Sequence, residues 1–373
     1  MAGKKAKLNS GARKIILLAL LLLIAAAAVF VFMNRAAISA RFASAGGTDS
    51  VSQSEPYTFE SGSQQVAAAV GSGLALASTN SLQLLDGSGR AAARQVYSMK
   101  TPALTAADKS AAAFDVGGTA VCVARLDGTS AVVENTDTVI TAALNADGWL
   151  ALCTEASGYK GRVTVYNSDL KAVYQWNSGE GYLLSARVSP DDKYLAALCA
   201  GSGGCVVHLF ALSSTKEQAS YTAAGTLFID MDWLETGRLF LLGQTGCAVI
   251  DRAGALKGSY DFGGQYLTNY AFGGDGYAVL MLGKYRTGGT GSLTAIDSDC
   301  KLAGQAAVES ELVSLSCRGR TVAALCQDGL KLFTQSLTAA GSDTGVQGVK
   351  DALVREKGDV LLVSAYSAEV RSY

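Results

Sequence analysis

The stretch LLSARVSPDDKYLAALC, residues 183–199, contains two apolar segments joined by a short polar turn. Ser, Pro and Asp dominate the turn, SPDDK at 189–193, and these residue types provide the local hydrogen bonds and restricted φ angles of a tight turn. Alternating and then continuous apolar residues on either side are typical of β-strands. The stretch therefore predicts a β-hairpin.

Weaker copies of this hairpin recur along most of the chain. In each copy a polar or glycine turn precedes an apolar run, and the turns lie at Gly73, Lys109, Gly148, Lys193, Gly237, Gly276, Gly319 and Gly358. The mean spacing is near 41 residues. A second, offset family of Asp or Asn turns adds another hairpin to each repeat, for example near Asp86 and Asn167. Four strands in about 41 residues are typical of one β-propeller blade.

The repeat predicts an all-β fold, an eight-bladed β-propeller over residues 56–373. Seven blades is the alternative, because the units at Lys109 and Gly358 match the pattern least well. The last unit contains about three strands, whereas residues 56–62 (PYTFESG) form an isolated strand-like segment. We expect these residues to pair with the carboxy-terminal blade, because closing the ring removes exposed sheet edges.

The amino-terminal residues predict a membrane anchor. Residues 15–33 (IILLALLLLIAAAAVFVFM) contain no charged residue, and as a helix they would be roughly 28 Å long, about one hydrocarbon core. Five Lys or Arg residues precede them within residues 1–14. The positive-inside rule then predicts a cytoplasmic basic tail at 1–14, a transmembrane helix at 15–33 and an extracytoplasmic domain.

A cleaved secretory signal is the alternative interpretation, since Ala43-Ser44-Ala45 has the small-x-small pattern of a cleavage site. The apolar run is longer than a signal core and ends ten residues before that site, which favours the uncleaved anchor. Residues 34–55 are small and polar without periodicity, so we expect a flexible stalk there.

The charge distribution argues against nucleic-acid binding. Seven of the 31 Lys and Arg residues lie within 1–41, and all 32 acidic residues follow. Residues 42–373 therefore carry 24 basic and 32 acidic groups, a net charge of −8. A domain of that charge is repelled by phosphate backbones.

Two segments carry a family likeness. SPDDKYLAAL at 189–198 resembles the hairpin of bacterial WD40-like and TolB-like propellers, and VYNSDLKAVYQW at 165–176 is similar to an outer-strand segment of quinoprotein-like propellers. The overall layout resembles uncharacterised Gram-positive proteins with one amino-terminal anchor and an exterior WD40-like or quinoprotein-like propeller domain. The resemblance implies that fold and location, and it brings no functional residue with it.

The cysteines suggest one disulfide. None of the eight cysteines forms a CxxC motif, which argues against zinc-ribbon and thioredoxin-like sites. Cys199 and Cys205 flank the loop AGSGG and could face each other across a hairpin, and an exterior compartment permits disulfides.

Motifs for catalysis, cofactor binding and metal binding are absent from the sequence. His208 is the only histidine, which excludes a histidine-rich metal site and makes a Ser-His-Asp triad hard to sustain. The segment Lys284-Tyr285-Arg286 precedes the glycine-rich run TGGTG and predicts a protruding basic and aromatic loop that could bind a partner.

These observations predict a non-catalytic module that binds or scaffolds an extracytoplasmic protein, peptide or cell-envelope polymer. A propeller presents loops at both ends of a central channel, which is a general binding geometry. The alternative is an enzyme, either a quinoprotein-like dehydrogenase or a carboxylate- or metal-dependent propeller hydrolase or lyase. Converging acidic side chains with raised pKa values along the channel would favour the enzyme.

Overall fold

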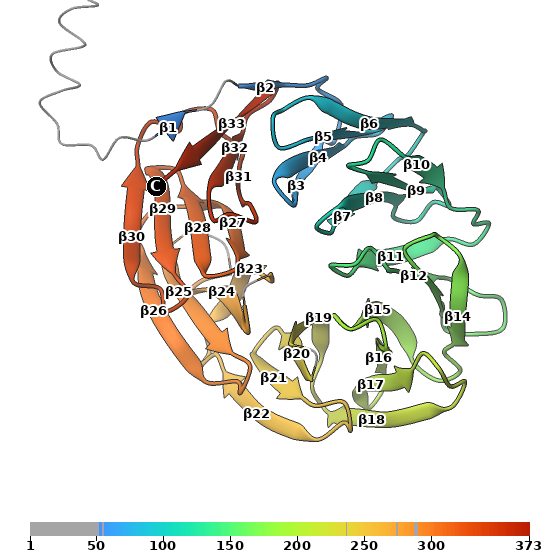
Figure 1. Ribbon diagram of the computed structural model, residues 1–373. Coiled ribbons are helices and arrows are strands. Elements are labelled where there is room, and N and C mark those ends of the chain that lie inside the picture. Colours follow the sequence, from blue (N-terminus) through green and yellow to red (C-terminus); the bar gives the residue numbers. More distant parts are fainter. Residues whose placement is uncertain (1–51, 54–55, 236, 274, 287–289) are drawn as a thin grey trace, which may run out of the picture. The chain divides into compact units, whose positions relative to one another are not determined.

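The computed structural model describes residues 52–53, 56–235, 237–273, 275–286 and 290–373. The regular secondary structure of these residues consists of β-strands. The strands form eight antiparallel sheets arranged in a ring (Figure 1). The eight-bladed propeller predicted from the repeat is confirmed, and the seven-bladed alternative is wrong.

The first four blades follow one another in the chain. Blade 1 contains β3 (Val66–Val70), β4 (Gly73–Ala77), β5 (Ser81–Leu85) and β6 (Ala91–Val96). Blade 2 contains β7 (Pro102–Ala106), β8 (Ser110–Asp115), β9 (Val121–Arg125) and β10 (Ser130–Val132). Blade 3 contains β11 (Val139–Leu144), β12 (Leu150–Thr154), β13 (Arg162–Tyr166) and β14 (Ala172–Asn177). Blade 4 contains β15 (Tyr182–Val188), β16 (Tyr194–Gly201), β17 (Gly204–Ala211) and β18 (Glu217–Ala224).

The remaining blades complete the ring. Blade 5 contains β19 (Phe228–Glu235), β20 (Arg238–Gly243), β21 (Gly246–Ile250) and β22 (Leu256–Asp261). Blade 6 contains β23 (Tyr266–Ala271), β24 (Tyr277–Gly283), β25 (Gly291–Asp297) and β26 (Leu302–Val308). Blade 7 contains β27 (Leu312–Arg318), β28 (Thr321–Cys326), β29 (Gly329–Thr334) and β30 (Ala339–Asp343). Blade 8 contains β31 (Asp351–Val354), β32 (Val360–Val363) and β33 (Ser367–Ser372), joined by β1 (Ser52–Gln53) and β2 (Tyr57–Thr58).

The second strand of each blade is the most continuously buried. β4 (GLALA), β12 (LALCT) and β24 (YAVLMLG) are buried at every position. Continuous burial follows from the architecture, because each blade is covered on both faces by its neighbours. Outer strands such as β22 alternate between exposed and half-buried residues, since only one side of them meets protein. This difference explains why the second strands read as unbroken apolar runs.

The turn quoted at the outset has the chemistry expected of it. The Ser189 hydroxyl accepts the Tyr194 N–H at 3.0 Å, and Asp192 adopts a left-handed φ of 58°. Asx and Ser side chains stabilise such turns by bonding to nearby backbone groups. Asp192 also accepts a hydrogen bond from Asn145 of blade 3, so the turn is attached to its neighbour.

The ring closes by pairing the two ends of the described chain. β2 pairs with β33, with Tyr57 opposite Ala368, and β1 pairs with the end of the same strand, with Ser52 opposite Ser372. The Arg355 guanidinium donates to the Tyr57 hydroxyl at 3.0 Å and also bonds to the Ser72 carbonyl. Ser52 and Gln53 lie within the stalk predicted at 34–55, but they pair with β33 and extend the outer strand of blade 8.

The predicted basic tail at 1–14, the predicted transmembrane helix at 15–33 and the stalk up to residue 51 lie outside the described residues. Among the residues that are described, no helix is long and apolar enough to cross a membrane.

Candidate functional site

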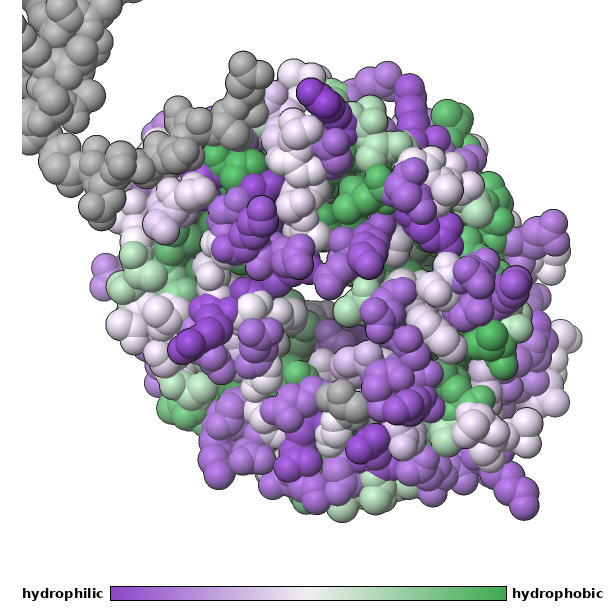
Figure 2. Space-filling model, in the orientation of Figure 1, coloured by the Kyte–Doolittle hydropathy of each residue, from purple (hydrophilic) through white to green (hydrophobic). Residues whose placement is uncertain are grey.

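A cavity of about 680 Å³ occupies one mouth of the central channel. All eight blades line it through the end of their first strand and the turn that follows, for example Ala106–Asp108 of blade 2 and Cys317–Gly319 of blade 7. Figure 2 shows a hollow at the centre of the ring, bordered by mainly hydrophilic residues. We call this cavity the channel mouth.

The wall of the channel mouth is chemically uneven. Blades 1 to 3 contribute mostly alanine, with Ala67–Ala69 of β3 as the extreme case. Blades 4 to 7 contribute the charged residues Arg187, Asp232, Asp275 and Arg318 and the aromatic residues Trp233 and Phe272. Asp108 of blade 2 and Glu356 of blade 8 are the other charged residues of the lining, so the arginines and the aromatic residues are concentrated on the side of blades 4 to 7.

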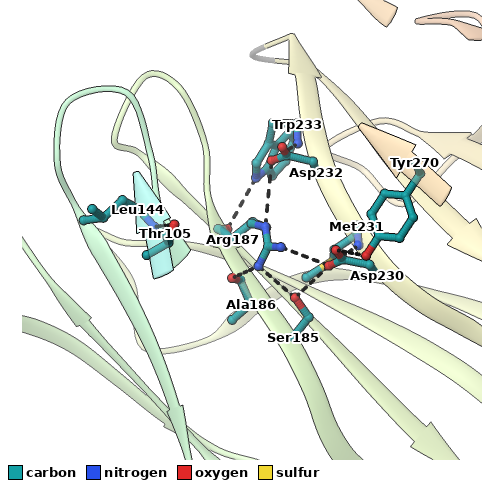
Figure 3. A network of polar contacts seen from close by, with 10 residues as sticks. All are labelled: Thr105, Leu144, Ser185, Ala186, Arg187, Asp230, Met231, Asp232, Trp233 and Tyr270. Atoms are coloured by element: carbon teal, nitrogen blue, oxygen red, sulfur yellow. Dashed lines mark hydrogen bonds and ion pairs between the residues drawn. The ribbon is translucent and has the colours of Figure 1, made fainter. Parts of the chain in front are cut away.

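Arg187 of β15 is the centre of a network between blades 4, 5 and 6 (Figure 3). Its guanidinium donates to Asp230 of β19 at 3.0 Å and lies 3.9 Å from the carboxylate of Asp232. A further bond goes to the Ser185 hydroxyl at 2.9 Å. Tyr270 of β23 donates to the second oxygen of Asp230 at 3.1 Å. The network thus connects the inner strands of three consecutive blades.

One carboxylate of this network, that of Asp232, has a shifted pKa. Desolvation raises the pKa of Asp232 to about 6, with the nearby Asp230 carboxylate adding to the shift and Arg187 opposing it. The side chain of Asp232 keeps 35% of its surface exposed, but that surface faces the confined channel mouth rather than open solvent. Burial also raises the pKa of Tyr270, so its hydroxyl remains a donor to Asp230.

The same side chains have a structural role. A blade's first strand has one unpaired edge toward the channel, and its N–H groups need partners. Asp230 and Asp232 accept the N–H of the residue that follows each of them, at 2.8 and 2.9 Å. Elsewhere hydroxyls do this across blades: Thr105 accepts the Leu144 N–H at 3.1 Å. Polar residues on the inner strands therefore accept hydrogen bonds from the backbone N–H groups of the unpaired strand edges.

A second ion pair crosses the channel mouth. Arg318 at the end of β27 in blade 7 bonds to Asp108 in the turn after β7 in blade 2. Blades 8 and 1 lie between these two blades in the ring, so the pair links non-adjacent blades. Arg187 and Arg318 both have carboxylate partners, and the lining as a whole contains four carboxylates and two guanidinium groups.

The opposite end of the ring carries the predicted loop. There the hairpins between second and third strands, such as Glu155–Lys160 and Lys284–Arg286, meet the beginnings of the first strands. Five exposed tyrosines lie at these positions: Tyr159, Tyr182, Tyr266, Tyr285 and Tyr366. We call this surface the tyrosine face. Tyr285, in the predicted loop, is 65% exposed.

Cationic side chains lie over three of these rings. The Lys160 ammonium is 4.7 Å from the centre of the Tyr182 ring, and the Arg286 guanidinium is 5.5 Å from that of Tyr266. The Lys284 ammonium lies 5.6 Å from the Tyr285 ring. Tyr159, Lys160 and Tyr182 also line a groove of about 470 Å³ between blades 3 and 4. The three residues of the predicted loop thus belong to a larger surface of cations and aromatic rings, and the groove within it also contains Asp137 and Glu155.

The disulfide expected between Cys199 and Cys205 is not formed, and both thiols are free. Cys199 lies opposite Val206 and Cys205 opposite Ala200 in the β16–β17 register. Cys205 therefore shares a face of the sheet with Ala200, the residue after Cys199. Because adjacent residues of a strand point to opposite faces, the side chains of Cys199 and Cys205 diverge. Cys199 packs toward blade 3 and Cys205 toward blade 5. A two-residue hairpin turn therefore prevents the pairing that the sequence spacing suggested.

Sequence reasoning did not identify the network around Arg187. A signal was present in FIDMDWLE at 228–235, where Asp230 and Asp232 interrupt an apolar strand with a period of two. That period places both carboxylates on one side of β19. Within the described part of the chain, no group of three or more His, Cys, Asp or Glu residues has metal-binding geometry.

Several solved structures share this fold. The chain is similar to the carboxy-terminal WD40 domain of Sif2, with a TM-score of 0.59 and 10% identity over 88% of this chain and 99% of that one. It is also similar to BamB from Moraxella catarrhalis, with a TM-score of 0.54 and 12% identity over 87% of this chain and 98% of that one.

A third similar structure is an enzyme. It is the dihydro-heme d1 dehydrogenase NirN, with a TM-score of 0.53 and 14% identity over 74% of this chain and 65% of that one. At such identities the likeness concerns the fold alone. No curated protein sequence matches this chain. A family model matches residues 47–336, more than two thirds of the chain. The chain therefore belongs to DUF5711, a family of unknown function.

Proposed function

We propose that this chain is a membrane-anchored, extracytoplasmic propeller that binds a protein, peptide or cell-envelope polymer on its tyrosine face, without catalysis. In this proposal residues 15–33 are the transmembrane anchor and residues 1–14 remain in the cytoplasm. The anchor is supported by the charge-free apolar run and by the basic residues that precede it.

The observation that carries the binding function is the group of five exposed tyrosines at one end of the ring. Tyrosine and arginine are enriched at protein interfaces, because they provide large rigid contact areas with a polar end. The stacked cations of Lys160, Lys284 and Arg286 would favour a partner with carboxylate or other anionic groups. The arginines of the channel mouth, by contrast, already have carboxylate partners.

The test is site-specific photocrosslinking of the full chain in its native membranes. A photoreactive side chain at Tyr285 should give a discrete adduct, whereas the same group at Val96, an exposed residue of the outer strand β6, should not. The double variant Tyr182→Ala, Arg286→Ala should reduce the adduct about tenfold, since interface aromatic and Arg residues dominate binding. Equal labelling from both probe positions, or no adduct from either, would contradict the proposal.

Membrane attachment has its own test. The mass of the membrane-bound mature protein should match the full chain. Loss of about 45 residues would show cleavage near Ala45 and replace the anchor with a secretory signal.

A second candidate function is a carboxylate-dependent hydrolase or lyase acting in the channel mouth. The observation that favours it is Asp232, which lines the cavity and has a pKa of about 6, within the range of a general acid or base. Turnover of any substrate from a panel of glycosides and esters, lost in Asp232→Asn but retained in Tyr285→Ala, would replace the binding proposal with this one.

A further inference from the structure

We propose that Cys247 and Cys300 form a reversible disulfide that links blades 5 and 6. Their Sγ atoms lie 3.9 Å apart, in van der Waals contact, although the residues are 53 positions apart in the sequence. Both side chains are buried, at 3% and 4% exposure. The proposed extracytoplasmic location would supply the oxidising setting, but the geometry stands without it.

The two cysteines come from different kinds of element. Cys247 is in β21, the third strand of blade 5, where it lies opposite Leu242 and Tyr260. Cys300 is in the turn between β25 and β26 of blade 6, and it has a left-handed φ of 61°. Asp297 holds this turn, because its carboxylate accepts the N–H groups of Asp299 and Lys301 at 3.0 and 2.8 Å.

The turn of blade 6 is docked on blade 5 by two further features. Arg238 of β20 lies 3.7 Å from the carboxylate of Asp299. Gly258 of β22 leaves space for the turn: a Cβ there would come within 2.5 Å of the Asp299 carbonyl oxygen and 2.9 Å of the Cys300 Cβ. Real side chains do not make such contacts, so the glycine permits the approach that brings the thiols together.

The remaining distance is small compared with what a disulfide requires. A disulfide bond is close to 2.05 Å long, so the sulfur atoms must approach by about 2 Å. Rotation of the two side chains about χ1, together with movement of the turn, can provide this. Cys199 and Cys205 are closer in sequence, yet they point to opposite faces of their blade.

The redox step balances with a small-molecule disulfide as oxidant. The hydrogen bond from Cys247 lowers the pKa of the Cys300 thiol, and burial opposes that shift. The Cys300 thiolate attacks one sulfur of the oxidant and releases the first thiol. Cys247, deprotonated, then attacks the Cys300 sulfur of the mixed disulfide and releases the second thiol. Two electrons and two protons pass from the protein cysteines to the oxidant, which leaves as two thiols.

The link would join two blades that pair through no backbone ladder. β21 and β22 belong to the sheet of blade 5 and β25 to that of blade 6, with no strand ladder between the two sheets. A covalent bond that encloses a loop of this length restricts the unfolded chain, and it should raise Tm by roughly 5 °C in the oxidised protein.

The experiment uses the full chain in detergent, equilibrated with oxidised and reduced glutathione. After acid quenching, alkylation and proteolysis without reductant, mass spectrometry should find the peptides containing Cys247 and Cys300 joined, with the loss of two hydrogen atoms. Reduction with dithiothreitol should release both peptides and reverse the Tm increase.

The variants Cys300→Ser and Cys199→Ala provide a matched pair. Cys300→Ser should abolish both the linked peptide and the Tm difference between oxidising and reducing buffers, whereas Cys199→Ala should leave both intact. The wild-type peptide map needs no variant and decides the question even if one fails to fold. The proposal is overturned if both cysteines are alkylated in full after oxidation, or if glutathione adducts form in place of the link. Either result would leave the proposed binding function untouched.

Discussion

The inner strands of blades 1 to 3 and those of blades 4 to 6 occupy equivalent positions but form different walls. β3 reads VAAAV and β7 reads PALTA, whereas β15 reads YLLSARV and β19 reads FIDMDWLE. Both kinds of strand border the channel, and in both the backbone N–H groups of one unpaired edge need hydrogen-bond acceptors. The propeller architecture therefore requires acceptors for these N–H groups, but it does not decide which side chains provide them.

On the alanine side a hydroxyl from the neighbouring blade provides the partner, as Thr105 does for Leu144. On the charged side carboxylates accept the N–H groups of the edge, as Asp230 does for Met231. These carboxylates require a cationic partner, which is Arg187. The charged arrangement has a larger desolvation cost than the hydroxyl arrangement, and its members depend on one another for charge compensation. Removing its cation should cost more than removing a single hydroxyl.

The largest effect is expected for Arg187→Ala. This substitution leaves the carboxylate of Asp230, whose side chain is only 19% exposed, without its ion-pair partner and with only neutral donors. Removing one partner of a buried pair typically costs several kcal/mol, so we expect a loss of about 3 kcal/mol in the free energy of unfolding. Denaturant unfolding at pH 7 measures it.

Arg94→Ala is the matched control for that substitution. Arg94 pairs with Glu60 at 2.6 Å, but both side chains are largely solvent-exposed. A surface pair of this kind should cost no more than about 1 kcal/mol. If the two variants lost equal stability, burial of the Arg187 network would not explain its contribution to the free energy of unfolding.

An intermediate effect is expected for Asp232→Asn, and it should depend on pH. Since the folded pKa of about 6 lies above the ordinary value near 3.8, the folded protein binds more protons than the unfolded chain between these two pH values. Wild-type stability should therefore fall as pH rises from about 4 to 6, with no further loss from this group above that range.

Asp232→Asn removes that fall and should be more stable than the wild type at pH 7, by roughly 1.5 kcal/mol after discounting for the exposed third of the side chain. Thermal or denaturant unfolding at several pH values between 4 and 8 provides the measurement. The same slope between pH 4 and 6 in both proteins would show that Asp232 titrates normally.

The smallest effect is expected on the alanine side, for Thr105→Val. The substitution keeps the shape of the side chain and leaves the Leu144 N–H without its acceptor between blades 2 and 3. The expected loss is about 1 kcal/mol. Thr105→Ser, which keeps the hydroxyl, should recover most of it in the same unfolding assay. A loss as large as that of Arg187→Ala would remove the distinction between the two walls.

The fold was accessible from the sequence because its signal is local and repeated. Each of the eight turns from Gly73 to Gly358 lies between the first and second strands of a blade, as the spacing indicated. A turn and the apolar run after it involve about ten consecutive residues, so their chemistry is visible without knowing what packs against them. The isolated segment at 56–62 likewise indicated the missing outer strand.

The candidate site was only partly accessible. The loop Lys284–Arg286 stood out by composition, but Tyr266, the ring that Arg286 covers, begins a different strand of the same blade, and nothing in the sequence relates the two. The cysteines show the same limit more sharply. Spacing favoured Cys199 with Cys205, whereas the contact that exists joins Cys247 to Cys300 across two blades.

The sequence alone predicted four-stranded repeats, eight blades with seven as the alternative, and the apolar character of the central strands, because turns and apolar periodicity are properties of consecutive residues. Only the tertiary structure decided which side chains meet. Arg187 with Asp230, Arg318 with Asp108 and Cys247 with Cys300 all depend on blade-to-blade geometry. That geometry is set by ring closure and by strand register, where a shift of one residue turns a side chain to the opposite face.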